Sequence, residues 1–279
     1  MSVINGMAAA VSLALSAAGI FAATETSQLS AESTARWEVD YGETKCRLIR
    51  HFGSGSDGGR LEIARDWSFG GYSWILVGAN VPVYTSATPV TVTLSPSLAA
   101  HRFQANPYLL DLRTARGVGW SDTDNRLVDA LRSDQQITVT GAKKLNVAIG
   151  LPNAPDALKA LEACDDDLIA GWGFDARQQR SLSAQVKPSN NPGRWVTNND
   201  YPREDFVRKN EGLTTFLLSV GIDGGVTGCR IVGSSGFPSL DKRTCELLNA
   251  RAAFAPAKDS SGRPVASFYI NRVWWQVPR

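Results

Sequence analysis

Residues 213–232, LTTFLLSVGIDGGVTGCRIV, decide the fold of the last third of this 279-residue chain. Two runs rich in β-branched and apolar residues flank Asp223-Gly224-Gly225, and these three residues tolerate the positive φ angles of a tight hairpin turn. The stretch therefore predicts two antiparallel strands, at residues 213–222 and 226–232. Because side chains alternate along a strand, Cys229 and Ile231 share one face of the hairpin.

A helix is predicted directly after this hairpin, over residues 240–252. At 3.6 residues per turn its apolar positions form one arc, with Cys245 at the edge of that arc. The arc consists of Leu240, Leu247, Leu248 and Ala252. We expect the arc to pack on the sheet face that carries Cys229, so that a Cys229–Cys245 disulfide joins helix to strand. Closing a loop of this length contributes about 3 kcal/mol to stability.

Shorter signals complete the order of elements around the hairpin. Pro202 suits the first turn of a helix over residues 204–208, which Asn210 and Gly212 end. The alternating run at residues 265–275 predicts a last strand. The order is therefore helix, strand, strand, helix, strand.

Several short motifs in this region occur in the order and spacing of a known family. They are Tyr201-Pro202, Gly212, Asp223-Gly-Gly-Val226, Ser234-Ser-Gly236, Leu240-Asp241, Phe254-Ala-Pro256-Ala and Gly262-Arg-Pro264-Val265. Over about residues 198–279 the chain resembles the TonB C-terminal domain. The resemblance implies a small αββαβ domain in the periplasm, whose last strand receives an extended segment of an outer-membrane receptor, the TonB box.

Such recognition adds a strand to a free sheet edge, where backbone hydrogen bonds give affinity and side chains give selectivity. The expected partner-binding residues are Val265, Ser267, Phe268, Tyr269, Ile270, Asn271, Arg272 and Val273. The alternative is that the side chains of this strand only fill cores. In that case Phe268, Ile270 and Trp274 lie in a core, and Tyr269 and Trp275 cover the other face.

A second, β-rich antiparallel domain is predicted for residues 36–180, which resemble no family that we can name. Short alternating runs separated by Gly, Ser and Asp clusters indicate strands, and a helix is expected at residues 155–168. Its Cys164 can face a strand, so the second expected disulfide is Cys46–Cys164. Residues 181–199 contain Pro188, Pro192 and Gly193 among polar residues, and this composition predicts a linker before the domain at residues 200–279.

The first 23 residues predict a signal peptide, because residues 7–23 form an uncharged, Ala-rich apolar run with small residues at its end. The retained alternatives are an inner-membrane anchor and a buried helix. Energy-transducing members of the TonB family join a firm anchor to the terminal domain through a long Pro-rich spacer. This chain has a folded domain and a short linker in that place, which puts force transmission in doubt.

Composition and motifs give little support to other classes of function. A net charge of +2 does not indicate nucleic acid or an anionic membrane as partner. No CxxC pair occurs and the chain has two histidines, so neither a metal site nor a cofactor is predicted. The GxGxxG match at residues 53–58 fits a hairpin loop better than a dinucleotide site, because a strand-like run follows it. The acidic run at residues 165–167 is expected to be a solvated helix end.

The sequence thus predicts an α+β protein without enzymatic activity, a periplasmic adaptor of TonB-dependent transport. Its expected partner is a receptor segment or another periplasmic protein. The alternatives are a short transducer anchored in the inner membrane and a module that self-associates as a homodimer through the same edge. A hydrolase in the N-terminal domain would need His51 or His101 as its base, and no GxSxG-like motif accompanies them.

Overall fold

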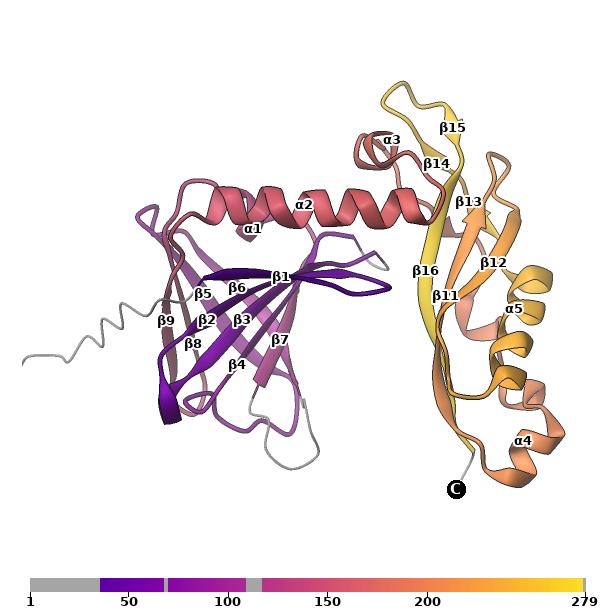
Figure 1. The fold of residues 1–279 in the computed structure, drawn as a ribbon, viewed down its shortest axis with the longest axis horizontal. Coiled ribbons are helices and arrows are strands. Elements are labelled where there is room, and N and C mark those ends of the chain that lie inside the picture. The colour runs from indigo at the N-terminus through magenta and orange to yellow at the C-terminus, as the bar shows by residue number, and fades with distance from the viewer. Residues whose placement is uncertain (1–35, 68–69, 109–116, 278–279) are drawn as a thin grey trace, which may run out of the picture. The chain divides into compact units, whose positions relative to one another are not determined.

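The computed structural model describes residues 36–67, 70–108 and 117–277, and these belong to one compact unit, residues 32–279. The predicted signal peptide or anchor lies outside the described residues. A nine-stranded antiparallel sheet with the order β1-β2-β3-β4-β7-β6-β5-β8-β9 forms the N-terminal region (Figure 1). Its strands are β1 (Trp37–Tyr41), β2 (Cys46–Phe52), β3 (Gly59–Arg65), β4 (Tyr72–Gly78), β5 (Thr88–Ser95), β6 (Ala100–Pro107), β7 (Gly117–Asp122), β8 (Gln136–Gly141) and β9 (Leu145–Gly150).

The core of this sheet follows from the alternation of its strands. In β5 and β9, every second residue is buried, and the apolar residues among them join one cluster with inward residues of β2, β3, β4, β7 and β8. The short 3-10 helix η1 (Gly55–Asp57) lies in the β2–β3 hairpin, so the GxGxxG match is a hairpin loop. The predicted antiparallel β-rich class is confirmed.

Two helices cover this core, α1 (Arg126–Ala130) and α2 (Ala154–Gly171). The Asp122 carboxylate accepts a hydrogen bond from the backbone N–H of Leu127 at 2.9 Å and so caps α1. Helix α2 lies against β1 and β2, and the Cys46–Cys164 disulfide joins it to β2.

The acidic run on α2 differs from the expectation of a solvated helix end. Helix α2 continues to Gly171, so the run lies inside the helix, and Asp165 is 2% exposed. Its carboxylate lies 3.4 Å from the guanidinium of Arg65. Asp166 pairs with Arg180, and Asp167 is exposed as expected.

After α3 (Ala176–Arg180), the segment expected to be a linker packs along the C-terminal region. Its strand β10 (Lys187–Pro188) pairs with β13 (Phe254–Ala255), and Ala184 forms a bridge to Lys258. Val186 and Trp195 are buried in the same apolar cluster as Phe216. The 3-10 helices η2 (Pro192–Arg194) and η3 (Asn198–Asp200) complete the segment.

The C-terminal region has the predicted αββαβ order. Its main elements are α4 (Arg203–Arg208), β11 (Gly212–Val220), β12 (Val226–Gly233), α5 (Pro238–Arg251) and β16 (Ser267–Trp275). The hairpin turn has Gly224 at a φ of +82°, as its sequence demands. Before β16, the short strands β14 (Ala257–Lys258) and β15 (Pro264–Val265) pair with each other.

The three-stranded sheet has the order β12-β11-β16, and Figure 1 shows α5 alongside β11 and β12. Leu240, Leu247 and Leu248 of α5 are buried, and the Cys229–Cys245 disulfide joins α5 to β12, so both disulfides are the pairs expected from the sequence. Two register shifts interrupt the β11–β12 ladder, near Thr215 and near Val220, and each leaves an extra residue on β12.

None of the helices in the described part of the chain is both long and apolar enough to cross a membrane.

Candidate partner-binding edge

Strand β16 forms one edge of the three-stranded sheet. It pairs with β11 along its whole length, from Ser267 opposite Val220 to Trp275 opposite Gly212. Within the described residues, no strand pairs with its other side. An unpaired edge presents a row of backbone N–H and C=O groups to which another strand can bind.

The two halves of β16 differ in burial. In the first half, Ser267, Tyr269 and Ile270 are 1%, 6% and 5% exposed, whereas in the second half Arg272 is exposed and Trp274 is 71% exposed. Tyr269 and Trp275 face the α5 side and belong to its apolar clusters. The first half is therefore closed on both faces of the sheet, and the second half is open on one.

Side chains from the end of α2 and from α3 hold the first half. The Gln179 amide, which is 5% exposed, donates to the carbonyl oxygen of Ala266 at 3.1 Å and accepts from the hydroxyl of Ser267 at 2.6 Å. The Phe268 ring lies 5.1 Å from Trp172 and 5.3 Å from Phe174, centroid to centroid. Trp67 contacts the same ring at 5.5 Å.

A groove of about 240 Å³ borders the second half. Every residue of β16 from Asn271 to Trp275 lines it, as does Gln276. Because successive residues of a strand face opposite sides, a groove that touches all of them runs along the backbone edge. The residues that line it from elsewhere are Pro192, Trp195, Val196, Thr197, Asn198, Tyr201, Phe216 and Leu248.

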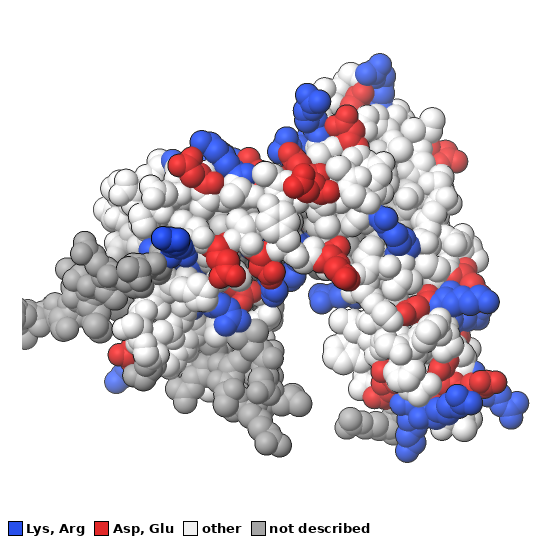
Figure 2. All heavy atoms as spheres, viewed as in Figure 1, with Lys and Arg blue, Asp and Glu red and all other residues white. Residues whose placement is uncertain are grey.

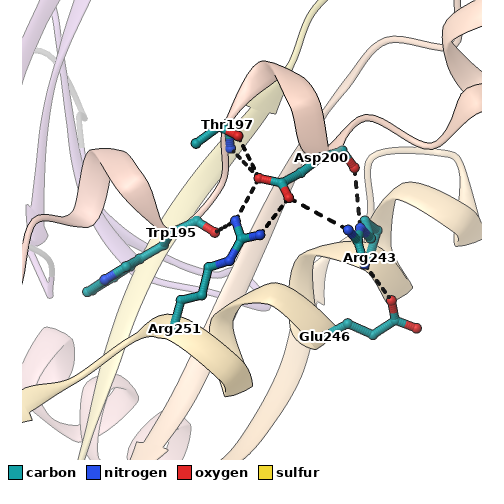
Figure 3. Close-up of polar contacts among 6 residues, drawn as sticks. All are labelled: Trp195, Thr197, Asp200, Arg243, Glu246 and Arg251. Carbon is teal, nitrogen blue, oxygen red and sulfur yellow. Dashed lines mark hydrogen bonds and ion pairs between the residues drawn. The ribbon is translucent and has the colours of Figure 1, made fainter.

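The far wall of the groove, residues 192–201, is fixed to α5 by an ion-pair network (Figure 3). The guanidinium of Arg251 donates to both carboxylate oxygens of Asp200, at 2.7 and 2.8 Å, and to the carbonyl oxygen of Trp195 at 3.1 Å. The backbone N–H and hydroxyl of Thr197 donate to the same carboxylate, at 2.9 and 2.7 Å. Arg243 adds a bond from its Nε to the Asp200 carbonyl at 3.2 Å.

These donors stabilise the charged form of Asp200. The hydrogen bond from Arg251, followed by that from Thr197, holds the pKa of Asp200 well below its usual range, although burial acts in the opposite direction. The wall therefore carries a fully paired carboxylate behind the groove rather than a free charge within it.

Aromatic contacts shape the two ends of the same wall. The Trp195 ring packs at 5.9 Å against Tyr269, and the Tyr201 ring at 5.2 Å against Trp275. Tyr201 is fixed further because its hydroxyl donates to the carbonyl oxygen of Asn210 at 2.5 Å. Both ends of the wall are thus attached to β16 by ring contacts.

The residues expected to bind a partner do not all lie on one accessible surface. Val265 belongs to β15 and pairs with Ala257, and the side chains of Ser267, Tyr269 and Ile270 are buried. Asn271, Arg272 and Val273 border the groove. The alternative that placed Trp274 in the core is wrong, because Trp274 lies at the outer end of the strand and is largely exposed.

Sequence reasoning missed the opposite wall. Trp195 lies in a polar, Pro-containing segment, and a lone Trp in such a segment is a signal for burial, since so large an apolar ring seldom stays in water. Asp200 and Arg251 are 51 positions apart in the sequence, so no local sequence pattern predicts their ion pair.

The residues considered for catalysis or metal binding do not form a site. Nε2 of His51 lies 3.5 Å from Glu38 on the surface, and His101 packs at 6.5 Å against Phe103. Within the described residues, no group of three His, Cys, Asp or Glu side chains could hold a metal ion. Acidic and basic side chains are interspersed over the face shown in Figure 2.

The C-terminal region is a small αββαβ domain, and one side of its last strand is unpaired among the described residues. Residues 197–276 match the family described as Gram-negative bacterial TonB protein C-terminal, and the chain therefore carries a TonB C-terminal domain over these residues. Among solved structures, the chain is similar to the solution NMR structure of the Pseudomonas aeruginosa TonB CTD, at 23% identity and a TM-score of 0.26. That likeness covers 34% of this chain and 89% of the other. No curated protein matches this chain.

Proposed function

We propose that this protein is a periplasmic adaptor of TonB-dependent transport, without enzymatic activity, that binds an extended segment of an outer-membrane partner by strand addition to β16. The observation that carries the proposal is the unpaired side of β16 in a TonB C-terminal domain. The paired disulfides support an exported protein, because such bonds persist in oxidising compartments.

The partner chemistry follows from the edge. Backbone groups of an edge strand bind any extended chain, so the sheet supplies affinity, and the side chains beside the edge supply selectivity. The mixed charges on the face shown in Figure 2 and a net charge of +2 leave little long-range steering toward one partner. Selectivity therefore depends on contacts at the edge.

The test is a titration of the ¹⁵N-labelled full chain with peptides copied from the plug termini of outer-membrane receptors. We expect amide shifts concentrated on residues 265–276. The matched control is the same peptide with proline at alternate positions, which lacks the N–H donors that a strand needs. Equal shifts with both peptides, or no shift at millimolar peptide, would contradict strand addition.

The same samples distinguish the two alternative functions. A mass that rises with protein concentration, with shifts at β16 in the absence of peptide, would favour the self-associating module. Retention of residues 1–23 in the inner-membrane fraction of cells would favour the anchored transducer. The adaptor requires a monomer that is released from the membrane after export.

A further inference from the structure

We infer that a partner strand pairs only with the second half of β16, residues 271–276, and inserts one large uncharged side chain into the adjoining groove. This inference rests on the proposed function, and it narrows both the position of the partner and its chemistry. It follows from the unequal surroundings of the two halves of the strand.

The side chains of the first half of β16 already contact other parts of the chain. The Gln179 amide uses the Ala266 carbonyl oxygen and the Ser267 hydroxyl, and Phe268 is enclosed by Trp172 and Phe174. A partner strand at this half would have to displace a side chain that is 5% exposed and makes two hydrogen bonds. Leaving such buried groups without partners is costly.

The second half has room beside it. The groove runs along the backbone of residues 271–276 and is closed on its far side by residues 192–201. Its volume of about 240 Å³ is below the roughly 300–1,000 Å³ of pockets that enclose a drug-sized ligand. A groove of this size accepts one large side chain of an added strand.

The lining selects the chemistry of that side chain. The rings of Trp195, Tyr201 and Trp275 and the side chain of Val273 line it, with Thr197, Asn198 and Asn271 as polar groups. Among the described residues, no acidic residue and no lysine lines it, and the single charged residue is Arg272. Arg272 is exposed on the strand face opposite the buried Trp275 and the partly buried Val273. Asp200 lies behind the wall with its charge already paired. A charged side chain in the groove would lose water without gaining a counter-charge.

The alternation of side chains along the added strand determines what the neighbours of the inserted residue contact. When one residue of the added strand points into the groove on the α5 side, the residues before and after it point to the other face of the sheet. That face presents Arg272 and Trp274, which are exposed. Of the partner residues beside the groove, only every second one therefore points toward it.

The first experiment measures amide hydrogen exchange of the full chain with and without the receptor-derived peptides. We expect slower exchange at residues 271–276 and unchanged exchange at residues 267–270. Binding with protection that extends through 267–270 would overturn the inference and leave the proposed function intact. Absence of binding by every peptide would overturn both.

The second experiment replaces each peptide residue in turn by Ala and by Asp. We expect one position at which Ala weakens binding at least tenfold and Asp abolishes it, with small effects at the two adjacent positions. Equal sensitivity at all positions would contradict insertion of one side chain.

A matched pair of variants tests the groove from the side of the protein. Asn198 lines the groove, while its neighbour Asn199 does not, and both are exposed. Asn198→Trp fills the groove and is expected to weaken peptide binding at least tenfold, whereas Asn199→Trp leaves it within twofold. Equal affinities of the two variants would overturn the role of the groove.

Discussion

In each of the two disulfide-bonded regions, one bridge joins a helix to a strand, and a buried aspartate contacts an arginine. In the N-terminal region the aspartate is Asp165, one position after Cys164 on α2, and its Oδ1 atom has no hydrogen-bond partner among the described residues. In the C-terminal region the aspartate is Asp200, whose carboxylate accepts two bonds from Arg251 and two from Thr197.

Because the two carboxylates have different hydrogen-bond partners, their pKa values shift in opposite directions. Burial raises the pKa of Asp165 to about 7, against the opposing charge of Arg65, whereas the hydrogen bond from Arg251 lowers the pKa of Asp200. Both side chains are less than a tenth exposed. Burial alone therefore does not decide whether a carboxylate stabilises a fold, because the number of donors that face it determines the sign.

The largest effect is expected from the two disulfides. Their sequence separations are 118 and 16 residues, and a longer closed loop restricts the unfolded chain more. Cys46→Ser with Cys164→Ser should cost about 5 kcal/mol, and Cys229→Ser with Cys245→Ser about 3 kcal/mol. Urea unfolding of each double variant, followed by intrinsic tryptophan fluorescence, measures the two losses. A greater loss for the shorter loop would contradict this order.

A pH series on Asp165→Asn tests the first carboxylate. In the folded protein the pKa of Asp165 is about 7, above the ordinary 3.8. Between these two pH values the folded state binds more protons than the unfolded state, so the free energy of unfolding falls as pH rises from 4 through 7. Removal of the charge should therefore raise the free energy of unfolding at pH 8 by up to about 4 kcal/mol and leave it little changed at pH 4. The control is Asp167→Asn, at an exposed position of the same helix. An equal shift at pH 4 and pH 8 would contradict the assignment to a titrating group.

A smaller effect, with the opposite sign, is expected from Asp200→Asn. Its lowered pKa means that the stabilisation is present above the ordinary 3.8 and is lost as pH falls through the folded value. The variant should lose about 1–3 kcal/mol at pH 7, the contribution of hydrogen bonds to a charged group, and approach the parent protein in acid. Glu204→Gln, which removes an exposed pair with Arg208 at 3.9 Å, should change stability by less than about 0.5 kcal/mol. A difference between variant and parent that persists at the lowest pH would refute the mechanism.

Local patterns were sufficient for much of the fold. The hairpin around Asp223 and the two helices with their cysteines have periodic signals, and the structure has them at nearly the predicted bounds. The alternating runs of the N-terminal region correctly indicated an antiparallel β-rich domain. Strands β6 and β7 were not predicted. Their sequences, AHRFQANP and GVGWSD, contain little β-branched character, and pairing with β5 and β4 determines their conformation.

The candidate site was predictable only in part. The last strand and its free edge followed from the resemblance and from alternation. The groove could not be predicted, because it requires residues 192–201 to pack beside β16, and that contact depends on ion pairs between distant residues. Gln179 and Ser267 are 88 positions apart, so no local sequence pattern predicts the contact between Gln179 and the first half of β16.

The register shifts of the β11–β12 ladder bear on how many copies of a partner the sheet can recruit. A three-stranded sheet has two outer strands, and two flat outer strands would permit chain after chain to join in an open-ended polymer. The extra residues on β12, at each shift, bend that strand and disturb the spacing of its backbone groups. Growth through β12 is thereby discouraged, and the strand addition that we propose at β16 would end with a one-to-one complex.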